Sequence, residues 1–224
     1  MMGRVFRHID LASQSRHLPA MTVHLHHGDL PAGLNLGPVV AIDTETLGLK
    51  PQRDRLCLIQ LSAGDGDAHL VKFANREDYA APNLKALLVD PKVTKLFHYA
   101  RFDVAVLKAY LGVDVAPLWC TKIASKLCRT YTDRHGLKDL VKELLGVDIS
   151  KASQSSDWAA TTLSKDQLDY AASDVLHLHK LKAALEMMLA REGRTHLADA
   201  AFKFLPTRAA LDLLGWGEDD IFAH

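Results

Sequence analysis

Residues 39–45 read Val-Val-Ala-Ile-Asp-Thr-Glu, an apolar and β-branched run that ends in two acids separated by one residue. Such a run predicts a buried strand with the acids at its end. Because side chains alternate between the faces of a strand, we expect Asp43 and Glu45 on the same face. Two carboxylates on one face repel each other unless a cation lies between them. The pair therefore indicates either a divalent-metal site or a solvated strand end.

Strand and helix patterns alternate along the rest of the chain. Further strands are expected at residues 56–62, 68–73, 94–97 and 113–120, and helices at 83–89, 103–111, 121–128, 137–145 and from 164 to about 191. Gly64-Asp65-Gly66-Asp67 predicts a hairpin turn, and Ser164-Lys165-Asp166-Gln167 has the form of a capping box that opens a helix. His24, His26 and His27 indicate a strand-like surface run rather than a metal site. The whole pattern predicts an α/β fold with strands first and helices mostly after.

The composition is that of a folded domain. Of 224 residues, 48% are hydrophobic and 24% are charged, which excludes a disordered, collagen-like or coiled-coil chain. Residues 21–224 are expected to form one domain, and residues 1–20 a disordered extension rather than a targeting peptide. Lys plus Arg number 27 and Asp plus Glu number 27, so no global positive field attracts long polyanions. Any binding of nucleic acid must therefore be local.

The sequence carries no signal of export or of membrane insertion. Its cysteines, Cys57, Cys120 and Cys128, are odd in number and are not paired at zinc-ligand spacing, which favours a reducing compartment. No apolar run approaches the length of a membrane span, and residues 1–20 lack the apolar core of a secretory signal. These observations predict a cytoplasmic protein without membrane contact.

Two further stretches carry acids, one at the start of an expected helix and one inside the long helix. Residues 98–103 read His-Tyr-Ala-Arg-Phe-Asp and place Asp103 at the opening of an expected helix, where an acid commonly acts as an N-cap. Tyr170 and Asp174 are four residues apart in the long helix, so the phenol and the carboxylate share a face. That face is expected to be partly buried, and an unpaired buried carboxylate is costly, which favours a partner for Asp174.

The order and type of these acids resemble the DEDDy branch of the ribonuclease H-like 3′-5′ exonucleases. Asp43 and Glu45 match its first motif, Asp-x-Glu. Asp103, which follows an aromatic residue, matches the second motif, and Tyr170 and Asp174 match the third, Tyr-x-x-x-Asp. The resemblance implies a ribonuclease H-like exonuclease fold, with a mixed five-stranded sheet flanked by helices and a helical C-terminal part.

A closer resemblance covers nearly the whole chain from about residue 23. Residues 43–49, 120–127, 130–137 and 211–224 look like nanoRNase C, a family of compact oligoribonucleases. Residues 54–62 resemble ribonuclease D as well, but residues 160–163 read Ala-Thr-Thr-Leu where ribonuclease D often has Arg-Pro-Leu. The resemblance to nanoRNase C implies a homo-octameric 3′-5′ exoribonuclease that degrades very short RNAs, dinucleotides above all, to nucleoside 5′-monophosphates. The alternatives are a broader ribonuclease-D-like exonuclease on longer RNA or DNA, and an inactive nucleic-acid-binding module.

The resemblance also assigns roles to the acids. Asp43, Glu45 and Asp174 would hold the first of two divalent cations, Mg²⁺ or Mn²⁺, with Asp43 shared with the second cation and Asp103 supporting it. Tyr170 would orient the attacking water, because a free phenol with a pKa near 10 is a poor base at neutral pH.

Substrate contacts are expected from three more residues. Leu49 occupies the position at which related exonucleases wedge a leucine between the last two bases, with an ordinary core leucine as the alternative. Thr46 would touch the terminal 3′ hydroxyl and His98 the substrate backbone, unless both are structural polar groups. Several cations would either meet a 5′ phosphate or cover a solvated helical face: Lys122, Lys126, Arg129, Arg134 and Lys138.

Overall fold

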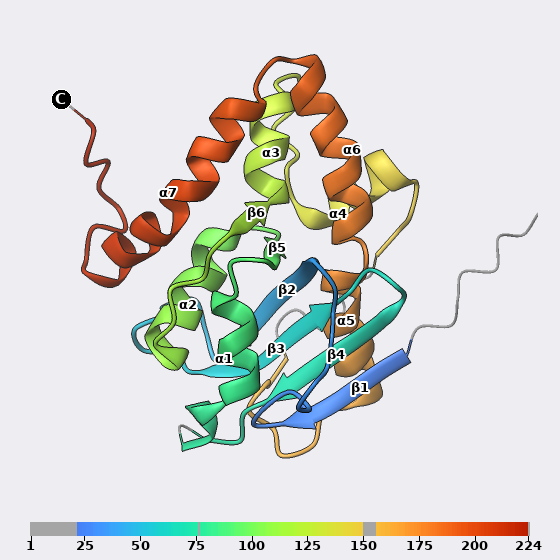
Figure 1. Cartoon of the computed structure of the whole chain (residues 1–224), viewed down its shortest axis with the longest axis vertical. Helices are drawn as coiled ribbons and strands as arrows, with labels where there is room; N and C mark the ends of the chain where they lie inside the picture. The colour runs from blue at the N-terminus through green and yellow to red at the C-terminus, as the bar shows by residue number, and fades with distance from the viewer. Residues whose placement is uncertain (1–21, 76, 150–155, 224) are drawn as a thin grey trace, which may run out of the picture.

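The computed structural model of the chain describes residues 22–75, 77–149 and 156–223. A mixed six-stranded sheet forms the centre of this described part (Figure 1). The strands are β1 (Thr22–His27), β2 (Val39–Thr46), β3 (Leu56–Ser62), β4 (Asp67–Lys72), β5 (Thr94–Phe97) and β6 (Leu118–Cys120), in the spatial order β1-β4-β3-β2-β5-β6. β3 runs antiparallel to β2 and β4, whereas the pairs β1–β4, β2–β5 and β5–β6 are parallel.

Helices cover the sheet and extend beyond one edge. They are a 3₁₀ turn η1 (Glu77–Ala80), α1 (Pro82–Val89), α2 (Ala100–Leu111), α3 (Thr121–Cys128), α4 (Leu137–Leu140), a π-helical turn η2 (Val141–Leu145), α5 (Lys165–Leu176), α6 (Leu178–Arg191) and α7 (Thr195–Leu213). α5 packs against β2, β3 and β4, and α2 contacts β2, β3 and β5. α3, α6 and α7 pack together beyond β6, at the top of the view in Figure 1. The strand β2 therefore contacts both α5 and α2.

The core explains the apolar run in β2 and the place where that strand ends. Val40, Ala41 and Ile42 of β2 have no accessible surface, and every residue of β3 is buried. A strand covered on both faces reads as a continuous apolar run, which is the pattern seen in the sequence. The register of β2 and β3 shifts between Glu45 and Thr46. Such bulges bend a strand and redirect its side chains, so the acids lie where β2 leaves the core.

The strands at 56–62 and 94–97 are confirmed to the residue, but the count of five is wrong. The sixth strand is β1, the histidine-bearing run, which adds to the sheet beside β4. The expected strand at 113–120 is also wrong in length, because only Leu118–Cys120 pairs with β5. Pro117 has no backbone N–H to donate, which accounts for the late start.

The helix at 121–128 and the capping box are confirmed. The Ser164 hydroxyl accepts from the backbone N–H of Gln167 at 3.2 Å, and the Gln167 side chain accepts from the backbone N–H of Ser164 at 2.9 Å. A single helix from 164 to 191 is wrong, because the chain divides at His177 into α5 and α6. The C-terminal part is helical, as the resemblance implied, but the sequence predicted no bounds for α7, which contains Pro206 in its interior.

Lys95 is a fully buried cation that links two loops, one before β5 and one before β6. Its ammonium group donates to the backbone carbonyls of Asp90, Val93 and Ala116 at 2.7–2.8 Å, and burial lowers its pKa to about 8.

Residues 1–20, for which the sequence predicts a disordered extension, lie outside the described residues. Among the described helices, none combines the length and apolar composition that a membrane crossing requires.

Candidate active site

The end of β2 sends alternate side chains toward two different helices. Asp43 and Glu45 lie on the side where Asp174 of α5 meets them. Thr44, between them, turns the other way, and its hydroxyl donates to the Asp103 carboxylate of α2 at 2.7 Å. The alternation of the strand thus gathers all four acids around one strand end, with Asp43 and Glu45 on one face as strand geometry predicts.

Three of these carboxylates form a tight cluster. Asp43, Glu45 and Asp174 each offer an oxygen, and these oxygens lie within 4.8 Å of one another. Burial raises the pKa of Asp43 to about 7 and that of Asp174 to about 8, the latter also through the charge of Asp43. Burial and the neighbouring carboxylates raise the pKa of Glu45 to about 10. Hard oxygen ligands that repel one another fit a divalent cation such as Mg²⁺ or Mn²⁺.

Asp103 lies beside this cluster rather than in it. Its side chain is buried, it accepts the hydrogen bond from Thr44, and burial together with the charge of Asp43 raises its pKa. The alternative role as an N-cap is wrong, because α2 begins at Ala100 after Tyr99 and has no side-chain cap. Asp103 therefore lies behind Thr44, close enough to the cluster for the charge of Asp43 to raise its pKa.

Tyr170 lies one helical turn before Asp174 on α5 and forms a hydrogen bond with it. The ring of Trp158 lies 6.1 Å from the Tyr170 ring, between centroids, and both line the same cleft. Burial and the charge of Asp174, followed by those of Glu45 and Asp43, raise the pKa of the phenol. Tyr170 is consequently a protonated hydrogen-bond donor at neutral pH, which suits orientation of a water molecule better than its deprotonation.

A cleft of about 660 Å³ opens over the cluster and includes all three residues predicted to bind substrate: Thr46, Leu49 and His98. Leu49 is 85% exposed, so the alternative of a core leucine is wrong. The backbone of Gly48, just before Leu49, lies against the side chain of Asp54. A Cβ atom at Gly48 would lie 2.3 Å from Oδ2 of Asp54, which also accepts from the backbone N–H of Lys50.

Thr46 and His98 line the cleft, yet both also have structural partners. The Thr46 hydroxyl donates to the carbonyl of Gly48. His98 Nδ1 lies 2.8 Å from the hydroxyl of Thr121, which donates to the carbonyl of Phe97. Burial and the nearby Lys122 lower the pKa of His98 to about 3, so its imidazole is neutral.

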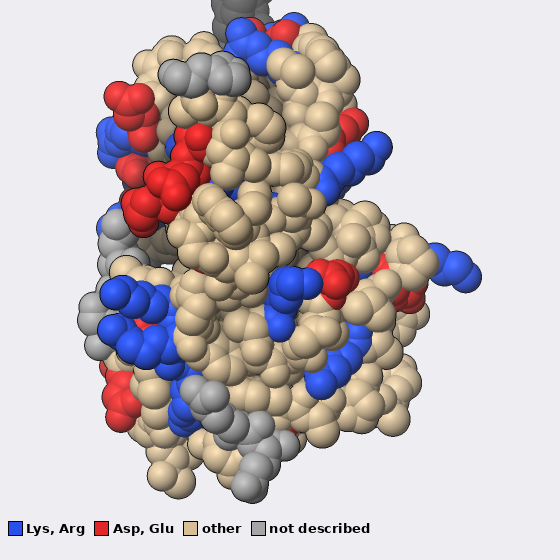
Figure 2. Space-filling view, turned by 90° about the vertical axis from the view of Figure 1, so that its left-hand side faces the viewer, with Lys and Arg blue, Asp and Glu red and all other residues tan. Residues whose placement is uncertain are grey.

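The structure separates the five cations proposed for a 5′ phosphate. Lys122 and Lys138 line the cleft. Lys126 is exposed outside it, and Arg134 pairs with Asp139 through contacts of 2.9 and 3.1 Å. On the face shown in Figure 2, the described Lys and Arg side chains lie in small groups interspersed with Asp and Glu. Of the five cations, Lys122 and Lys138 are therefore the two that offer a positive charge to the cleft.

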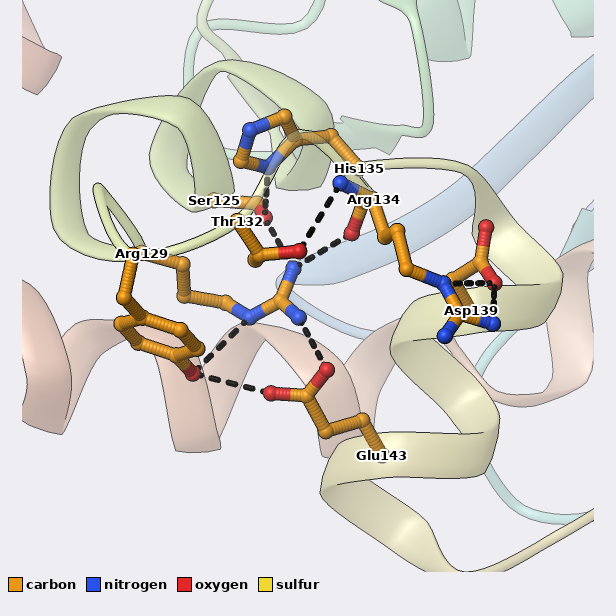
Figure 3. Close-up of polar contacts among 8 residues, drawn as sticks. Ser125, Arg129, Thr132, Arg134, His135, Asp139 and Glu143 are labelled. Atoms are coloured by element: carbon orange, nitrogen blue, oxygen red, sulfur yellow. Dashed lines mark hydrogen bonds and ion pairs between the residues drawn. The ribbon is translucent and has the colours of Figure 1, made fainter.

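For Arg129, both a phosphate contact and a solvated face are wrong, because the residue is completely buried. Its guanidinium donates to Ser125 at 3.0 Å, to the carbonyl of Arg134 at 2.7 Å and to Glu143 (Figure 3). The Tyr131 hydroxyl donates to the same carboxylate at 2.9 Å. A buried charge needs such partners. Arg129 therefore fixes the segment that leads into α4, whose first residues line the cleft.

Comparison with known proteins adds to this geometry. Residues 29–190 match the family described as 3′-5′ exonuclease. Ribonuclease D of Acidiphilium cryptum is 38% identical over 157 residues, which cover 70% of this chain and 39% of that protein. The solved structure of Escherichia coli RNase D is 29% identical, with a TM-score of 0.67, and the match covers 77% of this chain and 45% of that one. The chain thus spans about two fifths of the length of the curated relatives it matches.

The structure of Brucella melitensis NrnC bound to pGG is 60% identical and superimposes with a TM-score of 0.88, over 92% of this chain and 100% of that one. The chain belongs to the NrnC family. The resemblance to nanoRNase C is thereby confirmed, and the protein is a 3′-5′ exoribonuclease. A second structure, Brucella melitensis NrnC with bound Mg²⁺, is 59% identical with a TM-score of 0.86, and covers 91% of this chain and 100% of that one.

Tyr99 and Lys122 complete the cleft wall, and only Lys122 was singled out from the sequence. The Lys122 ammonium lies 4.0 Å from the centre of the Tyr99 ring. Tyr99 is one of two non-glycine residues with positive φ in the described part of the chain. In the sequence, the signal for Tyr99 is an aromatic residue within the stretch that leads to Asp103.

Proposed function

We propose that this NrnC-family exonuclease acts chiefly on very short RNAs, especially dinucleotides, and releases nucleoside 5′-monophosphates at a site that binds two divalent ions, Mg²⁺ or Mn²⁺. The observation that carries the proposal is the cluster of Asp43, Glu45 and Asp174, with oxygens within 4.8 Å of one another at the floor of a cleft of about 660 Å³. Clefts of about 300–1,000 Å³ bury ligands the size of drugs. A dinucleotide belongs to that size class and a long RNA does not.

The acids supply the ligands of the proposed metal site. Asp43, Glu45 and Asp174 would hold the first cation, with Asp43 shared with the second and Asp103 supporting it from behind Thr44. Bound divalent cations lower the pKa of a water molecule and stabilise charge on a leaving oxygen. The raised pKa values of the three clustered acids favour this arrangement, because a cation replaces the protons that the acids otherwise retain.

The remaining residues position the reaction. The Tyr170 phenol orients the attacking water, whose oxygen forms a bond to phosphorus while the bond from phosphorus to the 3′ oxygen of the preceding nucleotide breaks. The proton of the water goes to that 3′ oxygen, which leaves a shortened chain with a 3′ hydroxyl. Leu49, exposed beside the cluster, separates the last two bases, and Thr46 and His98 contact the sugar and backbone.

Charge also supports a short substrate. A long RNA offers many phosphates, and its binding requires many cations. The net charge is zero, and of the five cations named above only Lys122 and Lys138 line the cleft. Two lysines match the internal phosphate and one terminal phosphate of a dinucleotide. The NrnC structure bound to pGG is a relative with such a ligand.

Digestion of 5′-labelled RNAs of two, five and twenty nucleotides tests the proposal. The RNAs are compared at equal concentration with Mg²⁺, using the wild type, Asp43→Asn and, as a matched control, Asp114→Asn, whose side chain is 74% exposed and far from the cluster in sequence. We expect the dinucleotide to be cleaved much faster than the longer RNAs, by the wild type and the control only. Equal or faster trimming of the twenty-mer contradicts the length preference and favours the broader ribonuclease-D-like activity.

We also propose a homo-octamer, on the resemblance to nanoRNase C. Large apolar side chains near the C-terminal end are exposed in the single chain: Leu214, Trp216 and Phe222. Exposed apolar groups of this kind are typical of subunit contacts. Mass photometry is expected to give about eight times the chain mass of 24.7 kDa. A mass equal to one chain contradicts the assembly.

A further inference from the structure

The side chain of Tyr99 stands at the boundary of two hollows. It lines the active-site cleft and also a second hollow of about 560 Å³, which lies toward the turn after α7. Leu49 lines both hollows as well. Tyr99 is 48% exposed and Leu49 is 85% exposed. Together they present an aromatic and an aliphatic surface to any molecule that occupies the cleft.

The backbone of Tyr99 is held in a conformation that non-glycine residues rarely adopt. Its φ of 65° and ψ of 41° are left-handed, at the junction between the end of β5 and the start of α2. Glycine adopts such angles at no steric cost, whereas tyrosine is disfavoured there. Strain of this kind is concentrated at binding and catalytic sites. Glycine would adopt this backbone conformation without strain, which indicates that the aromatic side chain of Tyr99 has a function of its own.

A cation covers one face of the ring. The Lys122 ammonium lies 4.0 Å from the ring centre, in the geometry of a cation–π contact, and it lines the same cleft. The contact restrains the ring and keeps a positive charge next to its aromatic surface. That combination matches a nucleotide, which carries an anionic phosphate beside a flat base.

We propose that Tyr99 is a binding residue on which a nucleobase of the substrate stacks, next to Leu49. The inference rests on the proposed function, since it takes the occupant of this cleft to be a short RNA. Base stacking on an aromatic side chain lowers KM and leaves kcat nearly unchanged, because the ring does not touch the reacting phosphate. It also requires no hydrogen bond from the phenol.

Two variants separate the ring from the backbone. Tyr99→Gly removes the ring and relieves the positive-φ strain, so the fold is expected to persist, as circular dichroism would verify. Tyr99→Phe keeps the ring and serves as the matched control. The probe is 5′-phosphorylated diadenylate, together with two analogues in which one or the other nucleotide lacks its base.

We expect Tyr99→Gly to reduce kcat/KM for diadenylate by about 5- to 150-fold, mainly through KM, and Tyr99→Phe to stay close to the wild type. With one of the two abasic analogues the glycine penalty should disappear, since the ring then has no base to stack on. A penalty that persists with both analogues, or no penalty with diadenylate, overturns the proposal. The comparison is repeated on a twenty-mer with the same terminal nucleotides, so loss of the dinucleotide preference and loss of the Tyr99 effect are recorded separately.

Discussion

Replacing Asp43 by Asn in the metal-free protein is expected to increase the free energy of unfolding at pH 8. Burial raises the pKa of Asp43 from its ordinary value of 3.8 to about 7. At 1.36 kcal/mol for each pKa unit, the charged carboxylate costs the folded state about 4 kcal/mol once the pH exceeds that value. Asn has nearly the same shape and carries no charge, so the variant avoids this cost.

The pH dependence follows from the direction of the shift. Between about pH 4 and 7 the folded state binds a proton at Asp43 that the unfolded chain has released, so stability falls as the pH rises through this window. At pH 5 the wild type therefore loses only about 2 kcal/mol to this group, against about 4 kcal/mol at pH 8. The advantage of Asp43→Asn should grow accordingly from pH 5 to pH 8.

Urea denaturation with EDTA at both pH values, at equal protein concentration, measures the two differences. Asp114→Asn is the control, since its exposed side chain should give nearly the same stability as the wild type. Added Mg²⁺ should stabilise the wild type more than Asp43→Asn, because the variant lacks a ligand. Equal stabilities of wild type and Asp43→Asn at pH 8, or a difference that does not change with pH, would refute the burial and repulsion described for the cluster.

Three further predictions follow from single contacts. Lys95→Met leaves three backbone carbonyls without the donor that they share and should lower the free energy of unfolding by about 3 kcal/mol or more, as measured in urea; a loss below about 1 kcal/mol argues against the role of that ammonium group. Gly48→Ala places a Cβ against the Asp54 carboxylate and should reduce kcat/KM by about 10- to 100-fold, with partial recovery in the double variant with Asp54→Gly; no recovery assigns the loss to another cause. Thr44→Val removes the donor to buried Asp103 and should cost about 1–3 kcal/mol in thermal unfolding, whereas Thr44→Ser should retain most of the stability; equal losses in both variants contradict the hydrogen bond.

The parts of the fold set by local patterns were predictable from the sequence. The run at Leu56–Ser62 is apolar because β3 is buried along its whole length, and Ser164 with Gln167 forms a cap that depends only on neighbouring residues. The acids of the site follow the same logic. Strand alternation places Asp43 beside Glu45, and the resemblance to a known motif order supplied Asp174 from a distant helix.

The remaining features depend on contacts between distant segments. Arg129 resembles any exposed arginine in sequence, and its burial follows from Glu143 and the Arg134 carbonyl, which the fold brings to it. No glycine or proline marks the division between α5 and α6 at His177. Just beyond it, Nε2 of His179 lies 3.0 Å from the carbonyl oxygen of Val39, a contact between segments far apart in the sequence. α7 is long despite Pro206, which local rules count against a helix.

The alternation along β2 also determines which changes of chain length the protein can tolerate. Asp43 and Glu45 serve one side of the strand while Thr44 serves the other. Insertion or deletion of one residue within β2 would exchange the two sides, so the acids would face α2 and the metal ligands would be lost together. An insertion between Asp65 and Gly66, in the turn that joins β3 to β4, shifts no paired residue. Length variation during the divergence of this sequence should therefore be found at such turns and be absent from β2.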